Sequence, residues 1–152
     1  MDKETRRKYY FLKEKNKEKN KIIKLKNNVL FNECIDLLNE HHVLTFEKTD
    51  ILFGYLNDNF PMTNYGCINW KEVHDKKIIN ISDIYDMFNE DYEFYILWDQ
   101  LDIPCVRCKL STVLDNIDDV LAVSFNTWLL SINYKEVIEF HHEGGVIYGK
   151  IE

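Results

Sequence analysis

The residues best suited to chemistry stand side by side near the end of the chain, in the run His141, His142 and Glu143. Imidazole and carboxylate groups can bind a metal ion or carry protons. This run ends a segment with the pattern of a strand, and neighbouring strand residues point to opposite faces of a sheet. His141 and Glu143 could then share a face but His142 could not, which leaves two ligands where zinc needs three or four. We expect a polar edge at a hairpin turn, with a small metal-dependent enzyme at His141 and Glu143 as one alternative.

Carboxylates form a second candidate group, at Asp115, Asp118 and Asp119. A pair of carboxylates can act as general acid and base when the protein holds them several ångströms apart. A solvated acidic loop, or salt bridges with a protein partner, explains the same three residues without catalysis. The sequence also contains no glycine-rich phosphate-binding motif and no glycine-flanked nucleophile around Ser124. We therefore expect no catalytic site, no metal and no cofactor.

Cysteine spacing suggests a third kind of site, because Cys105 and Cys108 form a C-x-x-C motif. A redox dithiol needs its first cysteine at a helix N-terminus, where the thiolate is stabilised. Here Pro104 precedes the motif and the following residues alternate as in a strand, so that the two thiols should point to opposite faces. We expect these cysteines, together with Cys34 and Cys67, to be free structural thiols rather than a metal or redox site.

The charge of the chain is split between two segments. Residues 1–28 carry 11 Lys and Arg against 4 Asp and Glu, whereas residues 29–152 carry 8 against 22. The first segment therefore has a net charge of +7 and the second of −14. A strongly acidic body repels nucleic acid and attracts basic protein partners. Protein binding is thus favoured over chemistry. The main alternative is a nucleic-acid-associated regulator that uses residues 1–28, with the acidic body as a dimer or partner module.

Length and composition predict one folded domain preceded by an extension. The chain has 152 residues and 45% of them are hydrophobic, which suffices for a real core. Residues 1–28 are expected to be a basic N-terminal extension, helical or partly disordered, and residues 29–152 a single domain. The sequence has neither an apolar run long enough to span a bilayer nor a signal-peptide core. We therefore expect a cytosolic protein without membrane contact.

Hydrophobic periodicity predicts an α+β fold, in which N-terminal helices pack on a mostly antiparallel sheet that ends in a C-terminal three-stranded meander. Ser82 and Ser111 are expected to be the N-caps of two short helices. The longer predicted helices cover residues 29–41 and 46–60. The predicted strands or extended segments cover residues 65–70, 77–80, 93–99, 104–110, 120–130, 134–142 and 146–151. Trp70, Trp98 and Trp128 each fall in a predicted strand, where we expect core packing with a hydrogen bond from the indole.

The last two predicted strands should form a hairpin. Residues 143–145 read Glu-Gly-Gly, and glycine accepts the positive φ angles that tight turns need. In the strand before this turn, Val137 is expected on the opposite face from Ile138 and Phe140, because side chains alternate. The end of the chain is therefore predicted to be its most regular part.

Four short motifs resemble a known family. They read YGCINW at residues 65–70, NIDDV at 116–120, AVSFNTW at 122–128 and VIEFHHEG at 137–144. With these motifs, residues 46–151 resemble the cytosolic immunity proteins of bacterial contact-dependent growth inhibition and related polymorphic toxin systems. The resemblance leaves the basic segment 1–28 uncovered.

The resemblance implies a protein that binds the C-terminal toxin domain of a cognate effector and blocks its active site. Toxins of such systems are often basic nucleases, which suits the acidic body. Because the resemblance supplies no shared binding motif, contact residues are chosen by their charge and by their position beside the regular strands. The anionic candidates for toxin binding are Asp115, Asp118, Asp119, Glu139 and Glu143.

Overall fold

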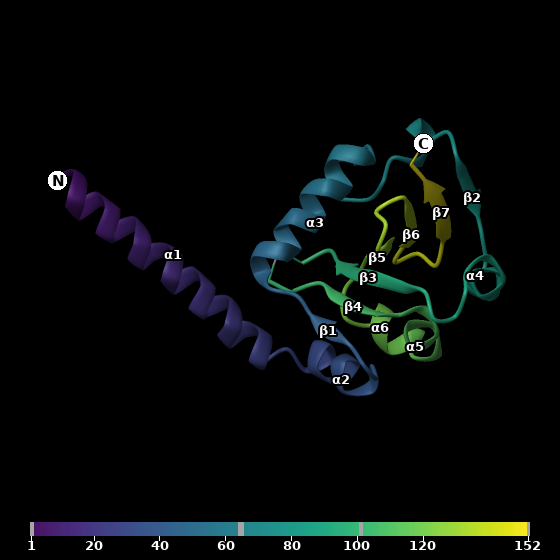
Figure 1. The fold of residues 1–152 in the computed structure, drawn as a ribbon, viewed down its shortest axis with the longest axis horizontal. Coiled ribbons are helices and arrows are strands. Elements are labelled where there is room, and N and C mark those ends of the chain that lie inside the picture. Colours follow the sequence, from purple (N-terminus) through teal and green to yellow (C-terminus); the bar gives the residue numbers. More distant parts are fainter. Residues whose placement is uncertain (1, 64–65, 101, 152) are drawn as a thin grey trace.

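Seven strands form one antiparallel sheet at the centre of the molecule (Figure 1). The computed structural model describes residues 2–63, 66–100 and 102–151. Its helices are α1 Lys3–Lys26, α2 Val29–Leu37, α3 Phe46–Asn59, α4 Ile81–Met87, α5 Leu110–Asp115 and α6 Ile117–Leu121, with a 3-10 turn at Trp70–Glu72. Its strands are β1 His42–Val43, β2 Lys76–Ile78, β3 Glu93–Trp98, β4 Val106–Lys109, β5 Thr127–Ser131, β6 Glu136–Phe140 and β7 Val146–Lys150. The strand order is β1-β4-β3-β5-β6-β7-β2, and β5 to β7 form a meander, which confirms the predicted α+β class.

The sheet separates two apolar cores. On one side, α2, α5 and α6 pack on strand residues that include Ile138 and Phe140, and we call this side the α5 face. On the other side, α3 packs Leu56 against Trp128 and Val137, and we call this side the α3 face. The predicted orientation of Val137 opposite Ile138 and Phe140 is thus confirmed. Burying one such side chain contributes about 1.5–3 kcal/mol, so both faces matter for stability.

Helix α1 stands apart from this body (Figure 1). None of its side chains is buried, and its C-terminal part meets the body through α2 and through Lys21, whose ammonium lies 5.3 Å from the ring centroid of Phe46. The chain turns at Asn28, whose Oδ1 accepts the N–H of Phe31 at 3.0 Å and so caps α2. The basic extension therefore forms one regular helix. The division of the chain into an extension at residues 1–28 and a single domain at 29–152 stays a prediction.

Residues 66–70 do not form the predicted strand, and Tyr65 lies outside the described residues. Ile68 makes one isolated bridge, and Trp70 opens the 3-10 turn. The reason is that the backbone N–H of Ile68 donates to the Glu139 carboxylate at 2.8 Å instead of to a neighbouring strand. This segment is thus fastened to the sheet by a side chain rather than by a ladder of backbone hydrogen bonds.

The predicted strand over residues 120–130 is too long. Val120 and Leu121, the first two residues of this predicted strand, belong to helix α6, where the N–H groups of Val120 and Ala122 donate to carbonyl groups four residues earlier. Strand β5 begins only at Thr127. Both Val120 and Val123 pack into the α5-face core. A short apolar run fits a buried helical turn as well as a buried strand, so that periodicity alone could not separate the two.

Both short helices begin two residues earlier than predicted. Helix α4 follows Asn80, whose backbone N–H donates to Oδ2 of Asp83 at 2.8 Å in a capping box, so that Ser82 is not the cap. Helix α5 begins at Leu110, before Ser111. The remaining strand predictions overlap β2, β3, β4, β6 and β7, and Gly144 in the last turn has the expected positive φ, at 97°.

Candidate functional site

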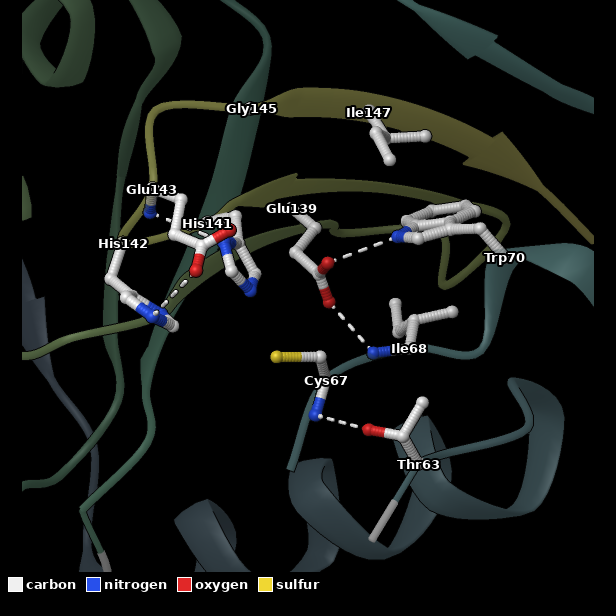
Figure 2. Close-up of a pocket in the computed structure, with 10 residues that line it drawn as sticks. All are labelled: Thr63, Cys67, Ile68, Trp70, Glu139, His141, His142, Glu143, Gly145 and Ile147. Carbon is white, nitrogen blue, oxygen red and sulfur yellow. Dashed lines mark hydrogen bonds and ion pairs between the residues drawn. The ribbon is translucent and has the colours of Figure 1, made fainter. Parts of the chain in front are cut away.

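A hollow of about 750 Å³ opens on the α3 face beside the end of β6 (Figure 2). Two parts of the chain far apart in the sequence enclose it, Thr63 with residues 67–70 on one side and the hairpin between β6 and β7 on the other. The lining residues are Thr63, Cys67, Ile68, Trp70, Glu139, His141, His142, Glu143, Gly145 and Ile147. The mixture of carboxylate, imidazole, thiol and indole groups makes this hollow the candidate functional site.

Glu139 forms the inner wall of the hollow, and its side chain is only 2% exposed. It belongs to β6, where alternation directs it to the α3 face together with Val137. Its carboxylate accepts hydrogen bonds from Nε1 of Trp128 at 2.8 Å, from the backbone N–H of Ile68 at 2.8 Å and from Nε1 of Trp70 at 3.0 Å. All three donors are neutral, so that the negative charge is held in place without a cation among these partners.

The three tryptophans make the hydrogen bonds expected of buried indoles. Trp70 and Trp128 donate to Glu139, and Trp98 donates to the carbonyl oxygen of Val120 at 2.9 Å. Trp98 and Trp128 lie in strands β3 and β5 as predicted, whereas Trp70 lies in the 3-10 turn. The indoles therefore serve packing on both faces, and two of them also fix the carboxylate of the hollow.

Asn126 organises the rim of the hollow from the loop before β5. Its Oδ1 accepts the backbone N–H of His142 at 3.2 Å and lies 3.2 Å from Nδ1 of the same residue. Its Nδ2 donates to Sγ of Cys67 at 3.4 Å. The neighbouring Phe125 is 77% exposed, with its ring edge-to-face on His142 at 5.9 Å between centroids. A buried amide thus holds an exposed aromatic ring and an imidazole in fixed positions.

The Cys67 thiol points into the hollow but is not activated (Figure 2). Burial raises the pKa of Cys67, and the negative charges of Glu139, Asp99 and Glu143 raise it further, against a smaller opposite effect from Asn126. The thiol therefore stays protonated at neutral pH. A nucleophilic or metal-binding cysteine requires the thiolate, which this environment disfavours.

The C-x-x-C motif is structural. Cys105 packs in the α3-face core and Cys108 in the α5-face core, so that the predicted opposite orientation is confirmed. Burial raises the pKa of Cys105 to about 12. All four cysteines of the chain are free. Two thiols on opposite sides of a sheet cannot form one metal or redox site.

The run His141, His142 and Glu143 does not have the predicted arrangement. Strand β6 ends at Phe140, so that the alternation rule does not extend into the turn. The two imidazole rings lie 4.1 Å apart between centroids, the Glu143 carboxylate lies 3.9 Å from Nε2 of His142, and the backbone N–H of Glu143 donates to Nδ1 of His141 at 3.2 Å, so that both imidazoles lie next to Glu143. Among residues 2–63, 66–100 and 102–151, no three His, Cys, Asp or Glu side chains are placed to hold a metal ion.

The five carboxylates predicted to bind a partner are not on one surface. Asp115, Asp118 and Asp119 are exposed on α5 and α6, on the α5 face. Glu143 is exposed at the hollow, and Glu139 is buried in its wall. One flat interface therefore cannot contain all five. Their role in binding stays a prediction.

Sequence reasoning missed Cys67, Phe125 and Asn126 as parts of this site. They come from loops that are held together by long-range hydrogen bonds of Asn126 and of Glu139. One signal was available, because Glu139 alternates with Val137 on the side of β6 that the hydrophobic pattern assigns to a core. A carboxylate at such an inward position needs hydrogen-bond donors, and the nearby tryptophans could supply them.

Comparison with known proteins places the chain in a family. Within the described residues, no helix combines the length and apolar character that crossing a membrane requires. A search of curated proteins found no match. A family model for the CdiI immunity protein, EcoliA0-like, matches residues 28–149, from the cap of α2 into β7. The match covers most of the chain and leaves out α1, in line with the resemblance carried by the four sequence motifs. The chain belongs to the CdiI immunity protein EcoliA0-like family, whose members are immunity proteins of contact-dependent growth inhibition systems.

Proposed function

We propose that this immunity protein acts in the cytosol, where it binds the C-terminal domain of its cognate toxin and blocks the active site, and that the toxin is a nuclease. The observation that supports the proposal is the net charge of −14 on residues 29–152. A nuclease must hold phosphates with cationic groups, so that its active site attracts carboxylates as well. Inhibition of this kind needs a rigid acidic surface and no turnover.

Asp115, Asp118 and Asp119 supply exposed charge for this purpose. None of the three makes an ion pair within the described part of the chain, so that their charge is not neutralised internally. They sit on two short helices that are fixed to the sheet by Val113, Leu114 and other buried residues. Such a surface accelerates encounter with a basic partner because opposite fields attract over about a Debye length.

The test is the salt dependence of association with the cognate toxin domain. We expect the association rate constant to fall by about tenfold or more between about 0.05 M and about 0.5 M salt, with a smaller change in the dissociation rate constant. The triple variant Asp115→Asn, Asp118→Asn, Asp119→Asn should flatten this dependence. A matched control removes three exposed carboxylates of α3, with Glu47→Gln, Asp50→Asn and Asp58→Asn. An association rate that ignores salt contradicts electrostatic steering.

Helix α1 supports a second candidate function, the binding of nucleic acid by a regulatory protein. It carries 11 Lys and Arg, none of its side chains is buried, and it lies outside the family match. Exposed cations bind phosphates, and exposed rings such as Tyr9 and Tyr10 can stack on bases. Removal of residues 1–20, which spares the cap at Asn28, separates the two functions. Toxin protection survives this deletion under the first function, and nucleic-acid binding disappears under the second.

A further inference from the structure

Two carboxylates line the hollow, those of Glu139 and Glu143, and no Lys or Arg of the described residues forms an ion pair with either. The three hydrogen-bond donors to Glu139 are neutral N–H groups. The Glu143 carboxylate pairs with His142 at 3.9 Å, and its backbone N–H donates to Nδ1 of His141. A third carboxylate, Asp99, does not line the hollow but acts on Cys67 and has no ion pair within the described residues. Lys76 lies near this region, but its ammonium donates to the backbone oxygen of Trp70 instead of to a carboxylate. The hollow is therefore a concave site with two carboxylates, with imidazoles at its rim and with no Lys or Arg among its described lining residues.

The charges act on the same small volume. Glu139, Asp99 and Glu143 all disfavour the thiolate of Cys67, whose side chain points into the hollow (Figure 2). Charge interactions are stronger in a partly buried site than in bulk water, because the effective dielectric constant is lower. A cation that enters gains from all three carboxylates, while an anion is repelled by all three. The electrostatic field of the carboxylates therefore favours a cationic ligand over an anionic one.

Aromatic rings complete the site. Trp70 lines the hollow, and Phe125 beside it is 77% exposed although the loop that carries it is held by Asn126. Rigid exposed aromatic residues are enriched among the residues that dominate binding energy at protein interfaces. Aromatic rings also attract guanidinium and ammonium groups and pack on their methylene stems. The rim is therefore suited to a long side chain with a charged end.

We propose that this hollow is the docking site for a lysine or arginine side chain of the toxin domain, with Phe125 packed against the surface around that side chain. The inference rests on the proposed toxin binding and names the surface involved, but it does not require the toxin to be a nuclease. Charge complementarity selects this occupant, since the hollow offers carboxylates and apolar rings and its described lining includes no Lys or Arg.

The first test compares variants of the hollow with matched variants elsewhere, in binding to the cognate toxin domain. Phe125→Ala and Glu143→Gln should each raise the dissociation rate constant by about tenfold or more, as expected for central interface residues. Asp36→Asn removes one exposed carboxylate, and Leu37→Ala shortens one exposed apolar side chain, both on α2 at the α5 face. These controls should change dissociation by less than about threefold.

The outcomes separate the two proposals. If the wild-type protein neither binds the toxin domain nor protects cells from it, the proposed function fails. If the wild-type protein binds and protects, but Phe125→Ala and Glu143→Gln behave like the α2 controls, only the docking site fails. Loss of binding in both hollow variants with normal urea unfolding curves supports the docking site.

A second test needs no toxin and uses arginine amide as the probe. The indole N–H of Trp70 lies at the hollow, where it donates to Glu139, and its proton signal serves as the reporter. Titration with arginine amide should shift this signal to saturation, and norleucine amide, which has a similar length but no guanidinium, should leave it in place. Glu143→Gln should weaken the arginine response. Equal responses to the two probes, or none to either, overturn the preference for a cation.

Discussion

Trp128 and Glu139 stand directly opposite each other on β5 and β6, and the indole Nε1 of Trp128 donates to Oε2 of Glu139 at 2.8 Å. The same carboxylate accepts the Ile68 N–H and the indole N–H of Trp70. One cross-strand pair therefore fastens the segment around residues 66–70 to the sheet and sets the inner wall of the hollow. Stability and the proposed docking site share this carboxylate.

Substitution of Glu139 by alanine should destabilise the protein strongly. It leaves the N–H groups of Ile68, Trp70 and Trp128 without their acceptor, and each buried donor without a partner costs about 1–3 kcal/mol. We expect the free energy of unfolding in urea to fall by at least about 3 kcal/mol. Glu143→Ala removes a carboxylate that is 78% exposed and should change the free energy of unfolding by less than about 0.5 kcal/mol. Equal effects of the two variants would contradict the anchoring role of Glu139.

A substitution at Gly149 in β7 tests whether the Trp70 indole must keep its position. A Cβ atom at residue 149 would lie 2.5 Å from Cζ3 and 2.9 Å from Cη2 of Trp70, which is closer than real contacts allow. Gly149→Ala should therefore displace the indole from Glu139 and lower the free energy of unfolding by about 1–3 kcal/mol. The matched control is Gly54→Ala in α3, where nothing lies within 4 Å of the new Cβ.

The control should behave in the opposite way. Alanine favours a helix interior over glycine, so that Gly54→Ala is expected to raise the free energy of unfolding by about 0.5–1 kcal/mol. The emission spectrum of the tryptophans should change for Gly149→Ala and stay unchanged for Gly54→Ala. A neutral Gly149→Ala variant with unchanged emission would show that the indole can move without cost.

The sequence predicted the regular strands better than the site. Alternation in β3 and β6 fixed which side chains face which core, as the opposite orientations of Val137 and Ile138 show. It failed for residues 120–123, where Val120 and Val123 fill the same core from a helix. It also failed for residues 66–70, because the backbone of Ile68 bonds to a side chain from β6, a partner 71 positions away. Contacts of this range leave no periodic signal in the local sequence.

The same limit applies to the carboxylates. Charge and position beside strands selected Glu139 and Glu143 together with Asp115, Asp118 and Asp119. Which of them share a surface depends on the order of strands and on the side that each helix covers, and local pattern determines neither. In the structure the three aspartates lie on the α5 face, and Glu139 and Glu143 lie at the hollow on the α3 face. Electrostatic steering by the aspartates and docking at the hollow can therefore be tested with separate variants.

Alkaline pH should destabilise the protein through its buried thiols. Burial raises the pKa of Cys34 and of Cys105 from the ordinary value of 9.0 to about 12. The folded state therefore keeps protons that the unfolded chain loses above about pH 9, and the resulting stability is lost as pH rises from about 9 toward about 12. Urea unfolding at about pH 8 and about pH 10.5 measures this slope. Tyr148, whose pKa burial and Glu136 also raise, adds to the same trend.

A thiol-free comparison isolates the two cysteines. In a Cys34→Ala, Cys105→Ala variant the tyrosine contribution remains, and the loss of unfolding free energy between the two pH values should be smaller than in the wild type. The variant is less stable throughout because its core is less well filled, which is why the slope and not the absolute value is compared. Identical slopes would mean that the two thiols titrate alike in folded and unfolded chains.

Removal of residues 1–20 should leave the fold intact and speed association with a basic toxin. No side chain of α1 is buried, so that the free energy of unfolding of the remaining chain should change by less than about 1 kcal/mol. The deletion removes 8 Lys and Arg and 4 Asp and Glu, which takes the net charge from −7 to −11. Electrostatic attraction to a cationic surface then increases, and the association rate constant at low salt should rise.

A Tyr9→Ser, Tyr10→Ser, Phe11→Ser variant keeps the charge and should associate like the wild type. If the deletion instead slows association or raises the dissociation rate constant, α1 itself contacts the toxin, and the body alone does not account for binding.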